Sequence, residues 1–251
     1  MNCCQIVFSP TGGTERVAQA ITRHWLPVDT IDLTHPDICY ADIALDDHTL
    51  VLIAMPSFGG AAPQLALDRL ALIKGNGAKC VLVAVYGNRA YEDTLIQMED
   101  YAQNAGFRVI AAVSAVAEHS IIREYGAGKP DDKDCAEFSA FGERILEKAS
   151  SGDLSTPSVP GKRPYKCHEA GLVPKADSGY TSCGLCAQKC PAGAISASSP
   201  DVTDKSKCIS CMRCVSLCPA QARKISSLVT TMLAAAIRKP CTTDKANELF
   251  L

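Results

Sequence analysis

The chain has 251 residues, of which 47% are hydrophobic, and its 25 Lys and Arg nearly balance 27 Asp and Glu. This length predicts one large or two modest domains, and no apolar run approaches the roughly 18 residues that a membrane-spanning helix needs. Fourteen cysteines without a recognisable signal peptide favour a reducing compartment and exclude a disulfide scaffold, so we expect a soluble, cytoplasmic protein.

Charge is divided unevenly along the chain. Residues 1–150 contain 12 Lys and Arg against 20 Asp and Glu, whereas residues 151–251 contain 13 against 7. The difference is either ordinary surface variation or an attraction between two halves. The basic residues are scattered and not interleaved with aromatic residues, so a nucleic-acid surface is not expected.

The chain begins with an apolar run of strand length at residues 3–9, followed by Ser9-Pro10-Thr11-Gly12-Gly13-Thr14 and an amphipathic helix at 15–25. A strand, a loop rich in glycine and hydroxyl groups, and a helix N-terminus together favour phosphate binding. The loop is neither a Walker A sequence nor G-x-G-x-x-G, so it suits a phosphomonoester better than a pyrophosphate. The alternative is an ordinary tight turn between strand and helix.

Four more strands are expected at 28–33, 49–55, 80–85 and 107–117, with helices at 63–73, 92–104 and 134–148. Strands alternating with helices predict a doubly wound, five-stranded parallel sheet. Ligands of such sheets bind at the carboxyl ends of the strands. The loops at 9–14, 56–60 and 86–91 all belong to that edge.

Residues 1–150 resemble flavodoxin, which binds FMN. The resemblance implies a phosphate loop at 9–14 and two loops that sandwich the flavin ring. Tyr86 or Tyr91 would stack on the ring and Phe58 is a third candidate, although each could instead cap the sheet core. His119, just past the fifth strand, would either contact the flavin or be a hydrogen-bonded loop residue. The predicted FMN residues are Ser9, Thr11, Gly12, Gly13, Thr14, Pro56, Ser57, Phe58, Gly59, Gly60, Tyr86, Gly87, Asn88, Arg89 and Tyr91.

Residues 151–164, rich in Ser, Pro and Gly, are the expected linker to a second domain at 165–225. That domain contains two cysteine strings. The second string, 208–219, has the spacing C-x2-C-x2-C-x3-C-P of bacterial 4Fe–4S ferredoxins. The first string, 180–191, has the same spacing with Tyr180 in place of the first cysteine. Residues 226–251 are expected to form a helix at 228–238 and a tail that packs back on one of the domains.

Tandem strings of this kind bind two clusters with crossed ligation, because the last cysteine of each string points to the other cluster. The second site would contain Cys190, Cys208, Cys211 and Cys214. The first site would contain Cys183, Cys186 and Cys218. Structural zinc is the alternative, but it needs neither a third cysteine in each string nor the prolines that follow the strings. Ile195 and Ile225 are expected in corresponding places beyond the two strings.

Tyr180 leaves the first site without its fourth thiolate. Three outcomes are open: a 4Fe–4S cluster with a substitute ligand, a 3Fe–4S cluster, or poor assembly. The substitute would be the Tyr180 oxygen, water, or Cys167 or His168 from the preceding segment.

Over nearly its full length the chain resembles the flavodoxin–ferredoxin fusion proteins of anaerobic bacteria, most closely at residues 86–93. A flavin with two clusters indicates an electron-transfer protein that moves low-potential electrons between clusters and FMN and exchanges them with a redox partner protein. Its runner-up is an FMN-dependent reductase of a small molecule or quinone, fed by the clusters. A third reading is a redox sensor that docks to a larger enzyme. The oligomeric state stays open.

Overall fold

The computed structural model describes residues 1–165 and 171–251. Five parallel strands form the centre of the amino-terminal half, in the order β2-β1-β3-β4-β5. This is the doubly wound order of the flavodoxin-like fold, which confirms the predicted fold class. The strands are β1 (Asn2–Val7), β2 (Val28–Asp32), β3 (Thr49–Pro56), β4 (Lys79–Tyr86) and β5 (Arg108–Val116).

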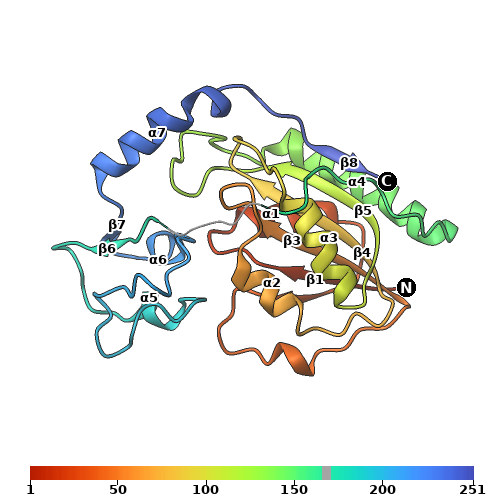
Figure 1. Cartoon of the computed structure of the whole chain (residues 1–251), viewed down its shortest axis with the longest axis horizontal. Helices are drawn as coiled ribbons and strands as arrows, with labels where there is room; N and C mark the ends of the chain where they lie inside the picture. Colours follow the sequence, from red (N-terminus) through yellow and green to blue (C-terminus); the bar gives the residue numbers. More distant parts are fainter. Residues whose placement is uncertain (166–170) are drawn as a thin grey trace.

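Four helices cover the two faces of this sheet (Figure 1). One face packs on α1 (Gly13–Ile21) and α4 (Asp132–Ser151), and the other on α2 (Gln64–Leu70) and α3 (Thr94–Asn104). Strands β3 and β4 are almost entirely buried, as expected for parallel strands that are covered on both sides. A short 3-10 helix, η1 (Tyr40–Asp42), lies in the β2–β3 connection.

A close helix contact fixes the position of α1, which starts the predicted phosphate site. The Trp25 indole donates a hydrogen bond to the Gly142 carbonyl of α4 (3.1 Å). A Cβ atom at Gly142 would lie 1.9 Å from the Ile21 carbonyl oxygen, so only glycine allows this approach. The helix ends at Ile21, with Thr22 as its C-cap, and not at Trp25 as predicted.

The sheet has a sixth strand that the sequence analysis did not predict. Strand β8 (Glu248–Phe250) pairs antiparallel with β5 at the edge of the sheet. It follows α7 (Ser227–Cys241), which extends from the cysteine-rich half back towards the sheet (Figure 1). The carboxyl-terminal segment is therefore part of the amino-terminal fold, although 131 residues (117–247) separate β5 from β8 in the sequence.

The cysteine-rich half is small and has internal pseudo-symmetry. Its two short strands, β6 (Lys175–Ala176) and β7 (Arg223–Lys224), pair with each other. Each string contains a one-turn helix, α5 (Leu185–Gln188) in the first and α6 (Arg213–Ser216) in the second. Matching residues of the two strings share the left-handed backbone conformation. The pairs are Ser182 and Ser210, Gly184 and Met212, and Gly193 and Gln221.

Within residues 1–165 and 171–251, no helix is both long and apolar enough to cross a lipid bilayer.

Candidate functional site: a flavin-sized cavity beside a cysteine cluster

The predicted phosphate loop lies between β1 and α1. The Ser9 hydroxyl accepts a hydrogen bond from the Glu15 N–H (2.9 Å), and the Ser9 N–H donates to the Thr34 hydroxyl (2.8 Å). Gly12 has a φ of 90° and caps α1 without a side-chain hydrogen bond. The Glu15 N–H is therefore capped by Ser9, which leaves the Gly13 and Thr14 N–H groups at the start of α1, on a loop held from behind; this is the arrangement that binds anions at helix N-termini.

A cavity of about 300 Å³ opens beside this loop. All three predicted loops contribute to it, because the carboxyl ends of β1, β3 and β4 meet at one edge of the sheet. Ser57 is fixed there by its N–H, which donates to the Val85 carbonyl (2.7 Å), and by the Thr94 hydroxyl (2.8 Å). The predicted residues that line the cavity are Thr11, Gly13, Thr14, Pro56, Ser57, Phe58, Gly59 and Tyr86.

The side chains of Asn88 and Tyr91, in the second half of the loop at 86–91, contact the carboxyl-terminal segment and do not line the cavity. Asn88 donates hydrogen bonds to the carbonyls of Cys241 (2.7 Å) and Thr243 (3.2 Å), and the Tyr91 hydroxyl donates to Glu248 (2.9 Å). These side chains bind the carboxyl-terminal segment that leads to β8, a role the sequence did not suggest. The predicted residues that do not line the cavity are Ser9, Gly12, Gly60, Gly87, Asn88, Arg89 and Tyr91.

Tyr86 is the aromatic residue of that loop that remains at the cavity. Its ring is buried and lies 5.2 Å from the Tyr91 ring, centre to centre, at a tilt of 57°. Burial raises the pKa of the Tyr86 phenol above its usual value, so the hydroxyl stays protonated. Tyr86 and Phe58 thus supply two aromatic walls on separate loops.

His119 also lines the cavity. Its Nδ1 accepts hydrogen bonds from the N–H groups of Ile121 (3.2 Å) and Ile122 (3.1 Å). Burial, and then the charge of Arg89, lower the pKa of the imidazole below its usual value. The ring is therefore neutral at pH 7, and because Nδ1 accepts, the proton is assigned to Nε2. His119 is therefore a hydrogen-bonded loop residue, as one of the two alternatives predicted, and its contact with flavin stays a prediction.

The cysteines of the second site come together across the two strings. Cys190, Cys208, Cys211 and Cys214 all line one small cavity. Burial, together with the nearby Cys190, Cys214 and Cys208 thiols, raises the pKa of the Cys211 thiol to about 12. Thiols that disfavour one another's ionisation need a bound cation to become thiolates, a charge that iron would supply.

Backbone donors support each string in the same way. The Ala194 N–H points to the Cys190 sulfur and the Ala222 N–H to the Cys218 sulfur, both at 3.3 Å. Such donors stabilise thiolates and tune clusters. Among the described residues, no three His, Cys, Asp or Glu side chains converge as a single-ion site would require; in a cubane each thiolate reaches a different iron.

Tyr180 lies at the first site, beside two of its cysteines. Burial, and next the Cys186 thiol, raise the pKa of its phenol, to which Cys183 also contributes. The hydroxyl oxygen is buried and has no well-formed hydrogen bond to any described residue. The other substitutes considered for the fourth ligand, Cys167 and His168, fall outside the residues that the structure describes.

Arg223 is a site residue that the sequence analysis missed. Its side chain is 1% exposed, and its guanidinium carbon lies 5.7 Å from the centre of the Tyr180 ring. Its position in the repeat corrects a prediction: the counterpart of Ile195, five residues after the last cysteine of its string, is Arg223 and not Ile225. Aligning the backbone donors Ala194 and Ala222 would have shown this.

The second string packs directly on the flavin-sized cavity. Cys211 and Ser210 line that cavity together with the three loops of the sheet. Arg213, two residues further on, donates to the carbonyls of Ser9 (3.4 Å) and Pro10 (3.3 Å) in the phosphate loop. No sequence signal distinguishes Arg213 from other basic residues, since its target is a pair of backbone carbonyls.

A second interdomain contact holds the first string. Arg69 of α2 donates to the Leu33 carbonyl (2.6 Å) and to the Pro191 carbonyl (2.7 Å), so one guanidinium joins the sheet half to the end of the first string. Ile209 packs against the apolar core below α2 and α3. The two halves are thus joined at both strings.

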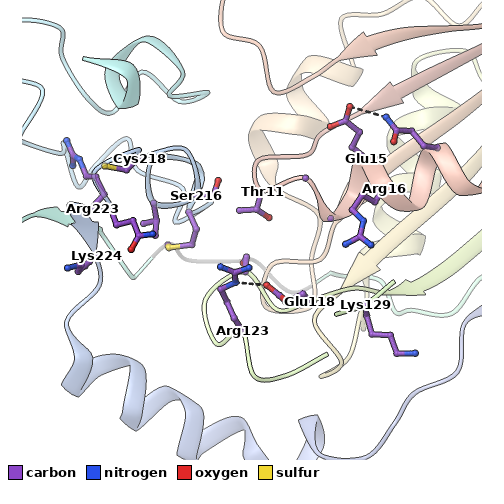
Figure 2. A pocket seen from close by; sticks show the side chains of 17 residues that line it. Thr11, Glu15, Arg16, Glu118, Arg123, Lys129, Ser216, Cys218, Arg223 and Lys224 are labelled. Atoms are coloured by element: carbon purple, nitrogen blue, oxygen red, sulfur yellow. Dashed lines mark hydrogen bonds and ion pairs between the residues drawn. The ribbon is translucent and has the colours of Figure 1, made fainter. Parts of the chain in front are cut away.

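A larger cavity, of about 890 Å³, lies on the other side of the phosphate loop (Figure 2). It extends from Thr11 to Cys218 of the first site. Basic side chains outnumber acidic ones in its wall, although the Arg123 guanidinium is paired with Glu118 (2.5 Å). Its charged residues are Glu15, Arg16, Glu118, Arg123, Lys129, Arg223 and Lys224.

Comparison with known proteins gives different matches for the two halves of the chain. Residues 181–223 match the model of a 4Fe–4S dicluster domain. The matched segment runs from just after Tyr180 to Arg223 and includes seven string cysteines. The chain thus joins a flavodoxin-like fold to a 4Fe–4S segment, which is the arrangement predicted. No curated protein matches the chain.

Several solved flavodoxins are similar to the amino-terminal half. One from the Archaea is 17% identical, with a TM-score of 0.44 over 60% of this chain and 99% of that one. One from Streptococcus pneumoniae is 20% identical (TM-score 0.42; 58% and 99%). A Fusobacterium nucleatum flavodoxin bound to flavin mononucleotide is 14% identical (0.40; 59% and 99%). The fold assignment rests on the strand order and not on these low scores.

Proposed function

We propose that this chain is an electron-transfer protein in which FMN occupies the 300 Å³ cavity and the cysteine strings bind two iron–sulfur clusters. One observation carries the proposal: Cys211, a predicted ligand of the second site, lines the same cavity as the three flavin loops. A ligand of one redox centre would then border the other. The 4Fe–4S segment and the flavodoxin-like fold support the coarser electron-transfer role.

The residues present fit FMN. Gly12 provides a left-handed turn with open space beside it, where a side chain would be strained. The uncapped N–H groups of α1 and the hydroxyls of Thr11 and Thr14 would hold the phosphate, because the helix dipole and these donors favour an anion. Phe58 and Tyr86 would flank the flavin ring. FMN, when bound, supplies exchange of electrons singly or in pairs, whereas a cluster supplies single-electron exchange.

The cysteines fit clusters of the crossed kind. Cys190, Cys208, Cys211 and Cys214 would hold the cluster of the second site, with the Ala194 N–H donating to the Cys190 sulfur. Cys183, Cys186 and Cys218 would hold that of the first site, with the Ala222 N–H donating to Cys218. The two sites would lie next to each other, since the Cys186 thiol of the first site contributes to the raised pKa of Cys214 in the second.

This arrangement gives the chain an order of redox centres. Cys211 faces the flavin cavity, whereas Cys183 is exposed and Cys218 lines the large cleft. We expect a redox partner protein to exchange electrons at the first site, from which they pass through the second site to FMN, or in reverse. Arg213 and Arg69 hold the strings against the sheet, so the path would not depend on motion of the linker.

The test is the rate of FMN reduction by a low-potential donor that reacts with the clusters, measured anaerobically by stopped flow. Cys211→Ser should retain FMN binding and slow flavin reduction by more than about tenfold, because it damages the cluster beside the cavity. Cys39→Ser, an exposed cysteine outside both strings, is the matched control. Equal rates in Cys211→Ser and the wild type, or a purified chain that binds no FMN, would refute the proposal.

A reductase of a small molecule is the second candidate, and the 890 Å³ cleft is the observation that favours it. Its excess of basic groups suits an anionic acceptor next to Cys218. Multiple turnovers with small anionic acceptors, in the absence of any partner protein, would support this function over that of a carrier.

A further inference from the structure

Two of the positions at which the repeated strings and the residues after them differ lie together in space. Tyr180 stands where the second string has Cys208, and Arg223 stands where the first string is followed by Ile195. In the folded chain the Arg223 guanidinium carbon is 5.7 Å from the centre of the Tyr180 ring. These two differences therefore lie together at the incomplete corner of the first site.

Both residues also carry a buried side-chain polar atom that makes no well-formed hydrogen bond to a described residue, although the Cys186 thiol lies beside the Tyr180 hydroxyl. Only three such side-chain atoms occur in the described part of the chain, and two are Tyr180 Oη and Arg223 Nε. The third is Arg213 Nε. Buried polar atoms normally have partners, so two orphans side by side indicate a group that completes them.

The charge of Arg223 points to the same missing group. Its other nitrogens donate to neutral oxygens, the Thr203 hydroxyl (2.7 Å) and the Pro200 carbonyl, and no described carboxylate pairs with it. A buried guanidinium without a counter-charge is strongly unfavourable. Among the described residues, Arg223 lies near Tyr180, which is itself beside Cys183 and Cys186 of the first site, and near Cys208 and Cys214 of the second site. Anionic clusters on these thiolates would supply the counter-charge.

We propose that Tyr180 and Arg223 act as one unit that closes the fourth corner of the first site. The Tyr180 oxygen would bind the fourth iron in place of a thiolate, and Arg223 would hold the ring at that corner and add positive charge beside the cluster. The Fe–O bond forms as the phenol O–H bond breaks, the proton passes to water, and no electron is transferred. This inference rests on the proposed cluster sites.

An oxygen donor at this corner changes the chemistry of the first site. Thiolates are the soft ligands that iron–sulfur clusters prefer, whereas a phenolate oxygen is harder. The fourth iron is then the one most easily lost, and the site differs from the all-cysteine second site in a way that spectroscopy detects. Arg223 is a positioning residue here, because it acts through Tyr180 and does not bind iron.

Iron content and EPR of anaerobically purified protein test this unit without any activity measurement. The wild type should contain about eight irons per chain, four for each cubane, and show no three-iron signal when oxidised. Tyr180→Phe keeps the ring and removes the oxygen, so it should fall to about seven irons with a three-iron signal. Tyr180→Cys should restore about eight irons and abolish any phenolate-to-iron absorption band.

A double-mutant comparison separates Arg223 from a merely structural residue. Arg223→Ile introduces the residue of the other repeat, and it should cause loss of the fourth iron in the wild-type background but not beside Tyr180→Cys. Arg223→Lys, which keeps the charge, should have an iron content between those of the wild type and Arg223→Ile. It replaces Arg223→Ile in the comparison if circular dichroism shows that the isoleucine variant is misfolded. Equal iron loss in both backgrounds would show that Arg223 does not act through Tyr180 and would overturn the proposal.

Other outcomes identify which statement fails. If Tyr180→Phe keeps about eight irons and an unchanged spectrum, Tyr180 is not a ligand and the inference is wrong; Cys167→Ser would then test the remaining thiol. If wild-type protein already contains the three-iron cluster, the inference is also wrong. If neither the wild type nor any variant binds iron, the proposed function fails along with it.

Discussion

The sheet half and the cysteine-rich half of this chain are stabilised by different forces. The sheet has a continuous apolar core on each face, formed by β1, β3, β4 and the four helices that cover them. The cysteine-rich half has few buried apolar side chains, namely Cys186, Ala194, Ile195, Met212 and Ala222. Burial of apolar area can stabilise the first half by itself. The second half has too little, so its folding depends on metal in the way of other small metallodomains.

Removal of iron should therefore give the largest effect. With a chelator under reducing conditions, residues 171–226 should lose most of their amide protection, whereas β1, β3 and β4 should keep theirs, because their core contains no cluster ligand. Hydrogen exchange with mass spectrometry measures both halves in one sample. Retained amide protection at α5 and α6 after complete iron loss would show that the cysteine-rich half does not need metal to fold.

Changing the phosphate loop should affect the sheet half alone. Gly12→Ala forces a Cβ into a left-handed conformation that costs about 1–2 kcal/mol, and its turn sets the N–H groups that would hold the FMN phosphate. We expect FMN affinity to fall by about tenfold with unchanged iron content. Fluorescence titration of FMN measures the affinity.

The matched control for that variant is Gly152→Ala. Gly152 also has positive φ and open space around it, but it caps the far end of α4. An equal loss of FMN affinity in both variants would mean that strain in the fold, and not the phosphate loop, causes the effect.

The contact between the halves can be weakened without touching either cofactor's ligands. Arg213→Met removes the hydrogen bonds to Ser9 and Pro10 and should slow electron transfer between clusters and flavin several-fold, with iron content unchanged. Lys239→Met, on the exposed side of α7, is the control. Stopped-flow flavin reduction measures the rate, and an unchanged rate would show that Arg213 does not hold the two centres together.

The smallest effect should be the contribution of His119 to pH dependence. Burial lowers the pKa of His119 in the folded chain below its usual value near 6.5. The unfolded chain then binds the proton first, so stability is lost as pH falls from about 6.5 towards the folded pKa. His119→Asn, whose side-chain oxygen can accept the Ile121 and Ile122 N–H groups, should reduce the difference in urea midpoint between neutral and mildly acidic pH. An identical difference in both proteins would exclude His119 as its source.

Part of the fold could be read from local pattern alone. The apolar runs that became β1, β3 and β4 have strand length, and the helices between them have one apolar face, so the order of elements was predicted correctly. The string spacing also required no tertiary information, since three thiolates within one loop reach one cubane. By contrast, β8 is three residues long and forms only because the edge of β5 offers it hydrogen-bond partners.

The sequence by itself determined the doubly wound sheet, the loop rich in glycine and hydroxyl groups at 9–14 and the seven string cysteines, because each depends on residues that are neighbours along the chain. Only the tertiary structure decided which of these come together. It placed Cys211 in the wall of the flavin-sized cavity, diverted Asn88 and Tyr91 to the carboxyl-terminal segment, and set Arg223 over Tyr180. Those contacts join residues far apart in sequence, and several end on backbone carbonyls that carry no side-chain signature, so no pattern of residues encodes them.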